Sequence, residues 1–450
     1  MSTIPEIAVA LRQLLTHTAD DLARFNRFVR RRDKPLTGSL FVQTILLTLL
    51  AKPAPALSDY CHTAAARGLR ISEQGFDGNF TEQAADLLLG VFKQLATLTS
   101  GAATPLAAGL LARFSAVLVF DSSCIPLPPS LGHQWMGGGN GQPPAAGAPA
   151  TVKLALGVEL RTGSVCAVEL RDGIVLDRLT QGQAHPVPPQ AVRLTDLGFF
   201  HLERFATIAA GAGYWFSRLQ TGVALWTAAA QRQELEDLLA AQAGTQVDEW
   251  VEVGVRARLP ARLMAVRVTQ EVADNRRRKL RAAARRKGQA VSTRRVASAD
   301  WNGYVTNIPA EQLSVEEAVV LAGVRWQIEL LFKLWKSHGR IDEWAASGNH
   351  WRVLCEIYGK LLAMLVSHWV LVVSCWADPA RSLRMAAAVV RQYAGGIVLS
   401  WDAEGQLIAM LEGIARVIRL TCQMTKRKKQ PSTYQLLENP ALVVNRGTLA

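Results

Sequence analysis

The sequence predicts a mixed α/β protein whose central part is flanked by helical N- and C-terminal parts. Three observations lead to this expectation. Before about residue 105, apolar residues recur at spacings of three and four, which is typical of amphipathic helices. Short runs rich in β-branched residues then alternate with helical patterns, as in an α/β sheet. Helical spacing returns after residue 340 and covers most of the remaining chain.

Composition limits the possible functions. The 450 residues suffice for two to four domains, and the 49% hydrophobic and 19% charged fractions exclude a disordered chain. The net charge of +13 favours a polyanionic partner, nucleic acid first and an anionic membrane surface second. Six cysteines without a C-x-x-C pair indicate reduced thiols in a cytosolic protein, and the N-terminus lacks the pattern of a secretory signal.

Residues 1–105 are expected to form a helical DNA-binding domain, with helices over 11–28, 39–50 and 81–98. Between the last two helices, a short helix pair separated by Gly68 is compatible with a helix-turn-helix that would turn Arg67 towards DNA. An ordinary helical subdomain is the commoner meaning of such a pair, and this stretch alone favours it.

The α/β part is expected to begin at residue 106 and to run to 220. Its expected elements are a strand over 115–120, a hairpin over 152–160 and 164–170, a strand over 191–195, a helix over 202–210 and a strand over 214–219. Asp121 and Asp196 each follow a strand. Because active residues of open α/β sheets gather at the carboxyl ends of strands, these two acids are candidate site residues.

Residues 221–307 are expected to interrupt this fold with a β-rich insertion, whose strands cover 250–255 and 263–272. The insertion carries ten positive residues within twenty and no acid among them. Such a block is self-repelling, so contact with a polyanion explains it better than a solvated helix face. The DNA-binding residues expected here are Arg276, Arg277, Arg278, Lys279, Arg281, Arg285, Arg286 and Lys287.

A long helix is expected from the capping box of Ser314 and Glu317 to about residue 337. The face expected to pack on the sheet carries Val324, Ile328, Leu331 and Trp335. A second face carries Arg325, Glu329 and Lys336, with Lys333 close to the same line. Taken alone, an Arg–Glu pair at this spacing is ordinarily a weak surface salt bridge, so this helix by itself indicates a structural pair.

Residues 346–450 are expected to form a helical C-terminal domain. Its stretch 361–377 has 17 residues without a formal charge, which is the short limit for a membrane span. Two serines and a histidine interrupt the stretch, so a buried helix is favoured over a membrane helix. A basic run at 426–429 is open to two interpretations, a DNA contact or a solubilising tail.

If Asp121, Asp196 and Glu329 converge, their carboxylates would repel one another unless cations neutralise them. Such hard oxygen ligands suit Mg²⁺ or Mn²⁺. Two such ions about 3.5–4 Å apart can activate a water or a 3′-hydroxyl on one side of a phosphodiester and stabilise the leaving oxygen on the other. Arg325 and Lys336 would then hold the flanking phosphate oxygens. The pattern indicates phosphoryl transfer on nucleic acid.

Together these residues resemble the DDE transposases of bacterial insertion sequences, specifically the type-4 group marked by a Tyr-Arg-Glu-Lys signature. Segments 120–128 and 195–200 are similar to the two aspartate strands of that group, and 71–80 is similar to a segment before its catalytic domain. The specific match is 325–336, which fits R-x3-E-x6-K. The resemblance spans about residues 30–440.

The resemblance implies an RNase-H-like (retroviral-integrase-like) core in two parts, 106–220 and 308–345, interrupted by the insertion. It implies that Asp121, Asp196 and Glu329 are catalytic and bind two Mg²⁺ (or Mn²⁺) ions. It also implies cut-and-paste transposition: cleavage at terminal inverted repeats of double-stranded DNA, followed by attack of the 3′-hydroxyl on target DNA. The enzyme would act as a homodimer on DNA in the bacterial cytoplasm, associated with the nucleoid and not with a membrane.

An insertion tryptophan that stacks on a flipped base is also implied, and Trp301, 28 residues before Glu329, is the candidate. An ordinary buried tryptophan is the alternative and is slightly favoured. The signature tyrosine is Ala322 here, which would weaken end binding or hairpin processing without affecting the metal ligands. A second hypothesis is therefore a catalytically inactive, transposase-derived DNA-binding protein.

Overall fold

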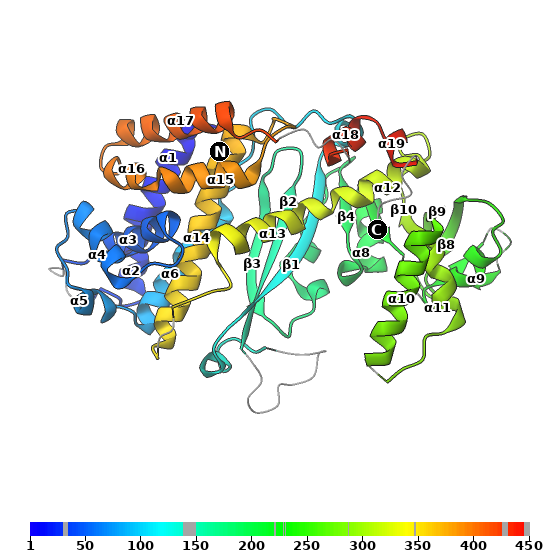
Figure 1. The fold of residues 1–450 in the computed structure, drawn as a ribbon, viewed down its shortest axis with the longest axis horizontal. Coiled ribbons are helices and arrows are strands. Elements are labelled where there is room, and N and C mark those ends of the chain that lie inside the picture. Colours follow the sequence, from blue (N-terminus) through cyan, green and yellow to red (C-terminus); the bar gives the residue numbers. More distant parts are fainter. Residues whose placement is uncertain are drawn as a thin grey trace.

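The computed structural model describes residues 1–29, 35–137, 150–219, 222–227, 229, 231–286, 288–345, 348–424 and 431–444. The molecule is elongated: a helical body forms one end, and a long twisted sheet runs from its centre to the other end (Figure 1). The expected mixed α/β architecture with helical terminal parts is confirmed.

One sheet runs through the molecule, and within the described residues it has ten strands in the order β3-β2-β1-β4-β5-β10-β9-β8-β6-β7. These strands are β1 (Val117–Pro126), β2 (Thr151–Glu159), β3 (Val165–Asp172), β4 (Val192–Thr195), β5 (Tyr214–Arg218), β6 (Ala224–Trp226), β7 (Arg232–Glu234), β8 (Gln246–Val253), β9 (Leu259–Arg267) and β10 (Trp301–Thr306). β4 is parallel to β1 and β5, and the other described pairs are antiparallel.

Strand β1 explains why the aspartate region is rigid. Val117, Val119, Leu118 and Phe120 are all buried, as expected of a strand covered on both faces. The sequence predicts that this strand ends at Asp121. In the structure it continues to Pro126, because β2 stays paired with it that far. Strands β8 and β9 each begin four residues earlier than expected, and a left-handed Gly254 (φ 95°) lies in the turn that joins them.

The terminal helices form one body rather than two separate ones. The N-terminal helices are α1 (Ile4–Gln13), α2 (Ala19–Phe25), α3 (Gly38–Ala51), α4 (Leu57–Ala66), α5 (Glu73–Asp77) and α6 (Glu82–Thr97). The C-terminal helices are α14 (His350–Cys375), α15 (Leu383–Gln392), α16 (Ala394–Leu399) and α17 (Glu404–Thr421). Both sets share a single hydrophobic core (Figure 1). Within it, α14 packs against α3 and α6 of the N-terminal set and against α15 and α17 of the C-terminal set.

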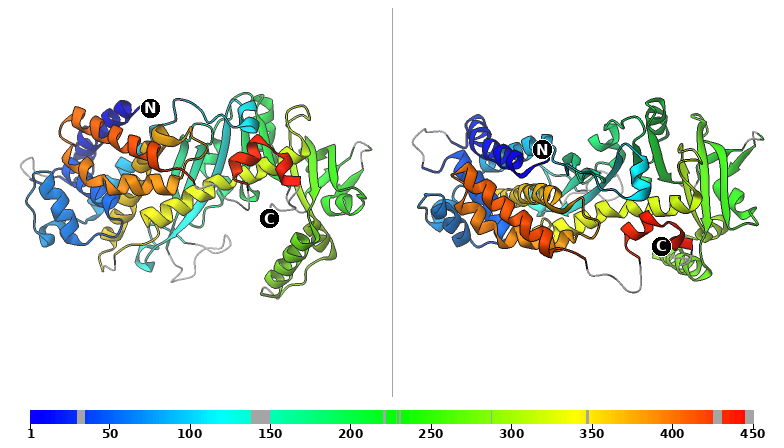
Figure 2. Two further views of the ribbon diagram at one scale, coloured as in Figure 1. Left: turned by 45° about the horizontal axis from the view of Figure 1, so that its top comes forward. Right: turned by 90° about the horizontal axis from the view of Figure 1, so that it is seen from above.

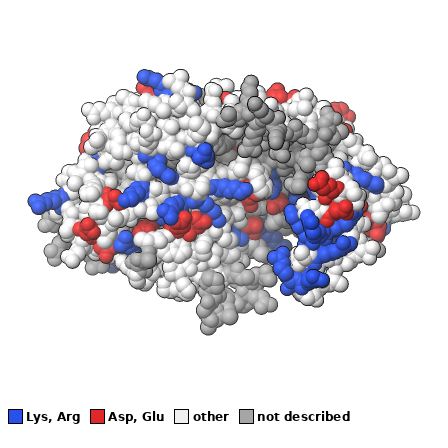
Figure 3. All heavy atoms as spheres, viewed as in Figure 1, with Lys and Arg blue, Asp and Glu red and all other residues white. Residues whose placement is uncertain are grey.

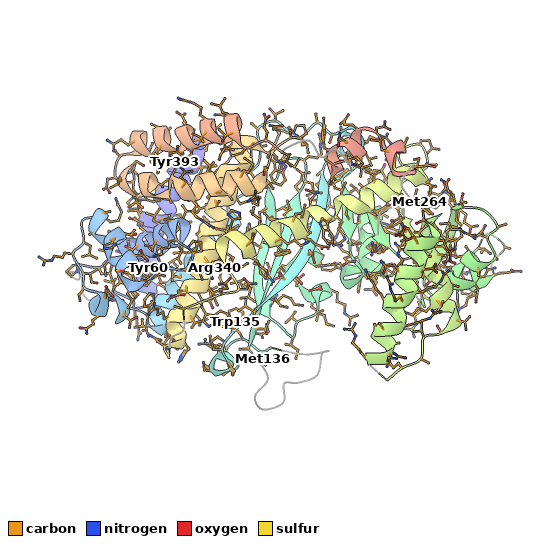
Figure 4. All side chains as sticks on the ribbon, in the orientation of Figure 1. Tyr60, Trp135, Met136, Met264, Arg340 and Tyr393 are labelled. Carbon is orange, nitrogen blue, oxygen red and sulfur yellow. The ribbon has the colours of Figure 1, made fainter. Side chains whose placement is uncertain are left out.

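Helix α14 contains the uncharged stretch that raised the membrane question. By length and composition it is the one described helix that could cross a membrane, yet 94% of its most apolar window is buried inside the protein. At Gly359 the helix approaches α3 so closely that a β-carbon would lie 2.5 Å from Ile45 Cγ2. Trp135, from the connection after β1, donates to the hydroxyl of Tyr358 on α14 and so ties the sheet to this body (Figure 4). The packing fits a core helix.

The candidate helix-turn-helix corresponds to α4 and the five-residue α5, separated by a left-handed Gly68. Arg67 does not face solvent: its guanidinium donates two hydrogen bonds, at 2.8 and 2.6 Å, to Asp402, and its side chain is only 6% exposed. This pairing ties α4 to the C-terminal helices, which fits the ordinary helical subdomain that the sequence favours.

Two nearly continuous helices, α12 (Val315–Val324) and α13 (Trp326–Gly339), cross one face of the sheet (Figure 1). They replace the single helix expected from 314 to 337, and Arg325 is the residue between them. The expected capping box of Ser314 and Glu317 is present. The C-terminal segments α18 (Thr433–Glu438) and α19 (Ala441–Val444) pack on α12.

The remaining helices belong to the opposite face and to the inserted half of the sheet: α7 (Gln181–Ala184), α8 (Leu202–Ala210), α9 (Leu235–Ala240), α10 (Gln270–Arg286) and α11 (Thr293–Ala297). The half of the sheet around β8, β9 and β10 has its own hydrophobic cluster, which reaches back to Trp215 and Phe205. Helix α10 projects away from the sheet into solvent (Figure 2). Helix α10 therefore projects from a part of the sheet that has its own hydrophobic cluster.

Candidate active site

Asp121 and Asp196 lie level with each other on neighbouring strands. In the parallel pair of β1 and β4, Val119 is opposite Leu194, so the residues two positions further on are also at the same level and face the same way. The side chain of Asp121 is 20% exposed and that of Asp196 is 41% exposed. Each accepts a hydrogen bond from the next backbone N–H, at 2.8 Å. The sheet therefore fixes two carboxylates side by side.

Glu329 reaches the same place from α13. Ile328, Leu331 and Trp335 are buried, which fixes the rotation of the helix over the sheet. Glu329, on the adjacent face of α13, is 26% exposed. The three acids that the sequence singles out are thus brought together, although Glu329 is 133 residues beyond Asp196.

Their meeting point is the guanidinium of Arg325. Its Nη2 donates to Glu329 Oε1 at 2.7 Å, and its Nη1 lies 3.9 Å from Asp121 Oδ2 and 3.9 Å from Asp196 Oδ2. Nη1 is buried and has no hydrogen-bond partner in the described part of the chain. The sequence suggested Arg325 as a phosphate ligand, and its contact with all three acids was not anticipated.

The electrostatics of the site are unfavourable for three charged acids. Burial raises the pKa of Asp121 to about 6, and the nearby Glu329 and Asp196 carboxylates also raise it. The Ser122 N–H and the Arg325 guanidinium act in the opposite direction but do not cancel the effect of burial. Three carboxylates opposed by one guanidinium carry a surplus of negative charge, so the site favours additional cations.

A divalent cation matches the donor chemistry, because carboxylate oxygens are the ligands that Mg²⁺ and Mn²⁺ prefer. As the described side chains stand, however, no group of three or more His, Cys, Asp or Glu residues could hold a metal ion. At this site the Arg325 guanidinium lies within 3.9 Å of an oxygen of each of the three acids. The residues fit a divalent cation provided that the guanidinium leaves.

The two lysines of α13 differ in position. Lys336 donates to the backbone oxygen of Cys124 in β1 at 3.3 Å and lies 3.9 Å from Asp342, about two turns of α13 beyond Glu329. Lys333 lies 4.3 Å from the centre of the Trp326 ring, which is 46% exposed. Both lysines border the site on the same helix as Glu329.

The basic block forms the projecting helix α10 and divides into two sets (Figure 3). Arg276 donates to the backbone oxygen of Trp301 and to Asn302, and Arg277 is paired with Asp274 and Asp300. These two arginines anchor the helix, and for Arg277 two acids just outside the basic block supply the partners. The expectation that both arginines bind DNA stays a prediction. The exposed set is Arg278, Lys279, Arg281, Arg285 and Arg286.

The remaining residues expected from the sequence to contact DNA are either buried or outside the described part of the chain. Trp301 is 6% exposed and Arg267 lies 4.8 Å from its ring centre, which favours the buried-tryptophan alternative. Lys287 and the basic run 426–429 lie outside the described residues. Asp177 was not expected near the site: its carboxylate accepts hydrogen bonds from Ser122, the residue after Asp121, and from Lys153. No motif marks Asp177, and Lys153 compensates its charge.

Comparison with known proteins identifies the family. The transposase DDE domain model matches residues 112–366, a span that includes all three acids. The transposase of insertion sequence IS231F from Bacillus thuringiensis subsp. israelensis is 25% identical over 80% of this chain and 79% of its own length. The IS1151 transposase of Clostridium perfringens is 22% identical, covering 66% of each chain.

A third relative, the putative transposase InsL for IS186A of Escherichia coli (strain K12), is 29% identical over 44% of this chain and 55% of its own length. The DDE domain implies an RNase-H-like fold, and the structure is accordingly mixed α/β. The chain belongs to the DDE transposases, enzymes of DNA transposition.

Proposed function

We propose that this transposase cuts DNA at the ends of its insertion sequence and joins the freed 3′-hydroxyl to target DNA, with Asp121, Asp196 and Glu329 as the catalytic carboxylates. The observation that carries this proposal is the convergence of all three acids on Arg325, from two strands and a helix far apart in the sequence. Three partly exposed acids that crowd one place are costly to fold, which argues that the cluster serves the chemistry.

Transposases with a DDE domain depend on divalent metal ions. We propose that the ions here are two Mg²⁺ (or Mn²⁺) held by the three acids; when bound, they would activate the attacking oxygen and stabilise the leaving one. Arg325 and Lys336 would bind the phosphates flanking the scissile bond, because guanidinium and ammonium groups donate strongly to phosphate oxygens. Lys333 would approach the same DNA from the exposed side of α13.

The DNA substrate of this transposase would extend from the acids to α10. Among the described residues, the five exposed cations, Arg278, Lys279, Arg281, Arg285 and Arg286, make no ion pair like those of Arg277, although Arg278 donates to Asn275 on the same helix. Cations at one projecting helix fit contacts to the phosphate backbone of double-stranded DNA. The second RNase-H-like segment, 308–345, and the insertion, 221–307, would thus hold one DNA end between them.

Several finer assignments are part of the same proposal. The spacing within 325–336 supports membership of the type-4 group, with Ala322 in place of the signature tyrosine. Cleavage at two inverted-repeat ends favours a homodimer on DNA, because two ends require two sites. The substrate favours a bacterial protein that works at the nucleoid in the cytoplasm.

A nicking assay tests the proposal. Full-length protein is incubated with Mg²⁺ and a duplex that carries the end of the element. Glu329→Gln is expected to lower the nicking rate by about 10³-fold, because it removes a charge that the transition state requires. The matched control is Glu356→Gln, which changes the glutamate of the next helix at the same spacing from an arginine and is expected to leave the rate per folded molecule unchanged.

The alternative of an inactive DNA-binding protein gives a different result. Wild type and Glu329→Gln would then bind the end duplex equally well, and neither would nick it in Mg²⁺ or Mn²⁺. Nicking by wild type that survives in Glu329→Gln would instead reject the assignment of the three acids.

A further inference from the structure

We propose that Arg325 is a built-in counter-cation that occupies the carboxylate cluster until DNA phosphate draws its guanidinium away, so that DNA binding opens the metal site. The inference rests on the proposed role of Asp121, Asp196 and Glu329 as metal ligands. It adds a second role for Arg325, in which this residue couples the binding of metal to the binding of DNA.

The contacts of Arg325 are the first step of the argument. One nitrogen makes a single good hydrogen bond, 2.7 Å to Glu329, while the other lies 3.9 Å from each aspartate, beyond hydrogen-bond distance. That second nitrogen is buried and has no hydrogen-bond partner within the described residues. The guanidinium therefore neutralises charge without filling its hydrogen-bonding capacity, which makes it easy to displace.

The second step concerns mutual exclusion. The guanidinium lies between the acids, and no group of three acids in the described chain could hold an ion in this arrangement. An arriving divalent cation would meet a fixed positive charge at the point where its ligands must converge. Repulsion between like charges is strong at this range in a partly buried site, so guanidinium and ion compete for the same carboxylates.

The third step concerns the position to which the Arg325 guanidinium could move. Arg325 is the residue between α12 and α13, and its side chain is 16% exposed, so it has access to solvent beside the acids. Lys336 is on the same face of α13 and contacts none of the three acids. A phosphate of a DNA strand that lies along α13 beside the acids would offer Arg325 oxygens that accept two hydrogen bonds at once, which the present contacts do not.

The consequence is reciprocal coupling. If DNA removes the competitor of the metal, then DNA raises the affinity for metal, and metal raises the affinity for DNA by the same factor. Coupling of this kind is commonly about 5–150-fold. The enzyme would then hold its metal ions weakly until an appropriate DNA is in place, which limits hydrolysis of other phosphodiesters.

The test measures Mn²⁺ binding rather than activity. Electron paramagnetic resonance of free Mn²⁺ gives the dissociation constant for full-length protein at fixed ionic strength, with and without an end duplex that carries a phosphorothioate at the scissile position. Without DNA, Arg325→Gln is expected to bind Mn²⁺ about tenfold more tightly than wild type. With DNA, wild type is expected to reach the affinity of the variant, and the variant to gain little.

Lys336→Gln is the matched control, because it removes one charge from the same helix face without altering a contact to the three acids. It is expected to change the DNA-free Mn²⁺ affinity by less than about twofold. An equal gain in Lys336→Gln would mean that any nearby cation repels the ion, which would overturn a specific role for Arg325. Equal or weaker DNA-free binding by Arg325→Gln would overturn it as well.

Asp121→Asn separates failure of this inference from failure of the proposed function. If Asp121→Asn binds Mn²⁺ as wild type does, the acids are not the metal site and both ideas fail. If Asp121→Asn loses Mn²⁺ binding while Arg325→Gln gains none, only the coupling by Arg325 is overturned. Thermal melting of each variant identifies any that is unfolded, and the more conservative Arg325→Lys then replaces Arg325→Gln, with an intermediate affinity expected.

Discussion

Two Arg–Glu pairs with the same spacing lie on successive long helices, and their surroundings differ. On α14, Arg352 donates to Glu356 at 3.2 Å and to Asp77 at 3.2 Å, and Glu356 also accepts from the Ala345 N–H. Immediately before α13, Arg325 donates to Glu329 on that helix and faces two further acids that it does not satisfy. The first pair balances its hydrogen bonds, whereas the second has more negative charge than it can neutralise.

The difference separates a structural pair from a functional one. Glu356 is 1% exposed and is held by donors from two directions, as a buried carboxylate must be. Glu329 is more exposed and belongs to a cluster whose members repel one another. A surplus of buried like charge is a cost that folding alone does not explain, and it is therefore a better indicator of a site than the salt bridge itself.

The largest effect that should distinguish the pairs is on stability. Arg352→Ala leaves Glu356 buried without its main partner and is expected to lower the free energy of unfolding by about 3 kcal/mol, at the lower end for a broken buried pair because Lys360 remains nearby. Arg325→Ala should cost less, and Mn²⁺ should restore the loss. Denaturant titration with and without Mn²⁺ measures both. If Mn²⁺ also restored the free energy of unfolding of Arg352→Ala, the metal would not distinguish the pair before α13 from the pair on α14.

The second effect is a pH dependence that only the α13 site should show. In the folded chain the pKa of Asp121 is raised from 3.8 to about 6, so the folded state binds this proton more tightly than the unfolded state does. The resulting stabilisation is complete below pH 3.8 and is lost as the pH rises through 6. Relative to Asp121→Asn, wild type is therefore expected to lose about 2 kcal/mol between pH 4 and 6, and about 0.4 kcal/mol more by pH 7.

Unfolding of both proteins across this range, in chelator to exclude divalent ions, measures the difference. The sign is the informative part. A wild type that gains stability over Asp121→Asn as the pH rises would indicate that Arg325 dominates burial at this carboxylate. The acids would then form an ordinary ion-pair cluster, like the one around Arg352.

Local pattern predicted much of this arrangement. The capping box at Ser314 and the strand before Asp196 follow from residue type and spacing, and the sheet register then brings the aspartates level. The ion-pair partners of the arginines could not be predicted from residue type and spacing. Arg67 pairs with Asp402, which is 335 residues away, and Arg277 pairs with Asp300 across a turn. Such contacts depend on packing between distant elements, which a single sequence does not encode at any fixed spacing.

The smallest effect repeats the same distinction within one helix. Arg281 and Arg277 are both on α10, but Arg281 is exposed whereas Arg277 is held by Asp274 and Asp300. If exposed cations bind DNA phosphate, Arg281→Ala should lower the slope of log affinity against log salt by about 0.9 and leave the melting temperature unchanged. Arg277→Ala should leave the slope unchanged and lower the melting temperature. Fluorescence anisotropy of a labelled duplex over a salt series measures the slopes, and equal slopes for both variants would mean that the internal ion pairs open on DNA.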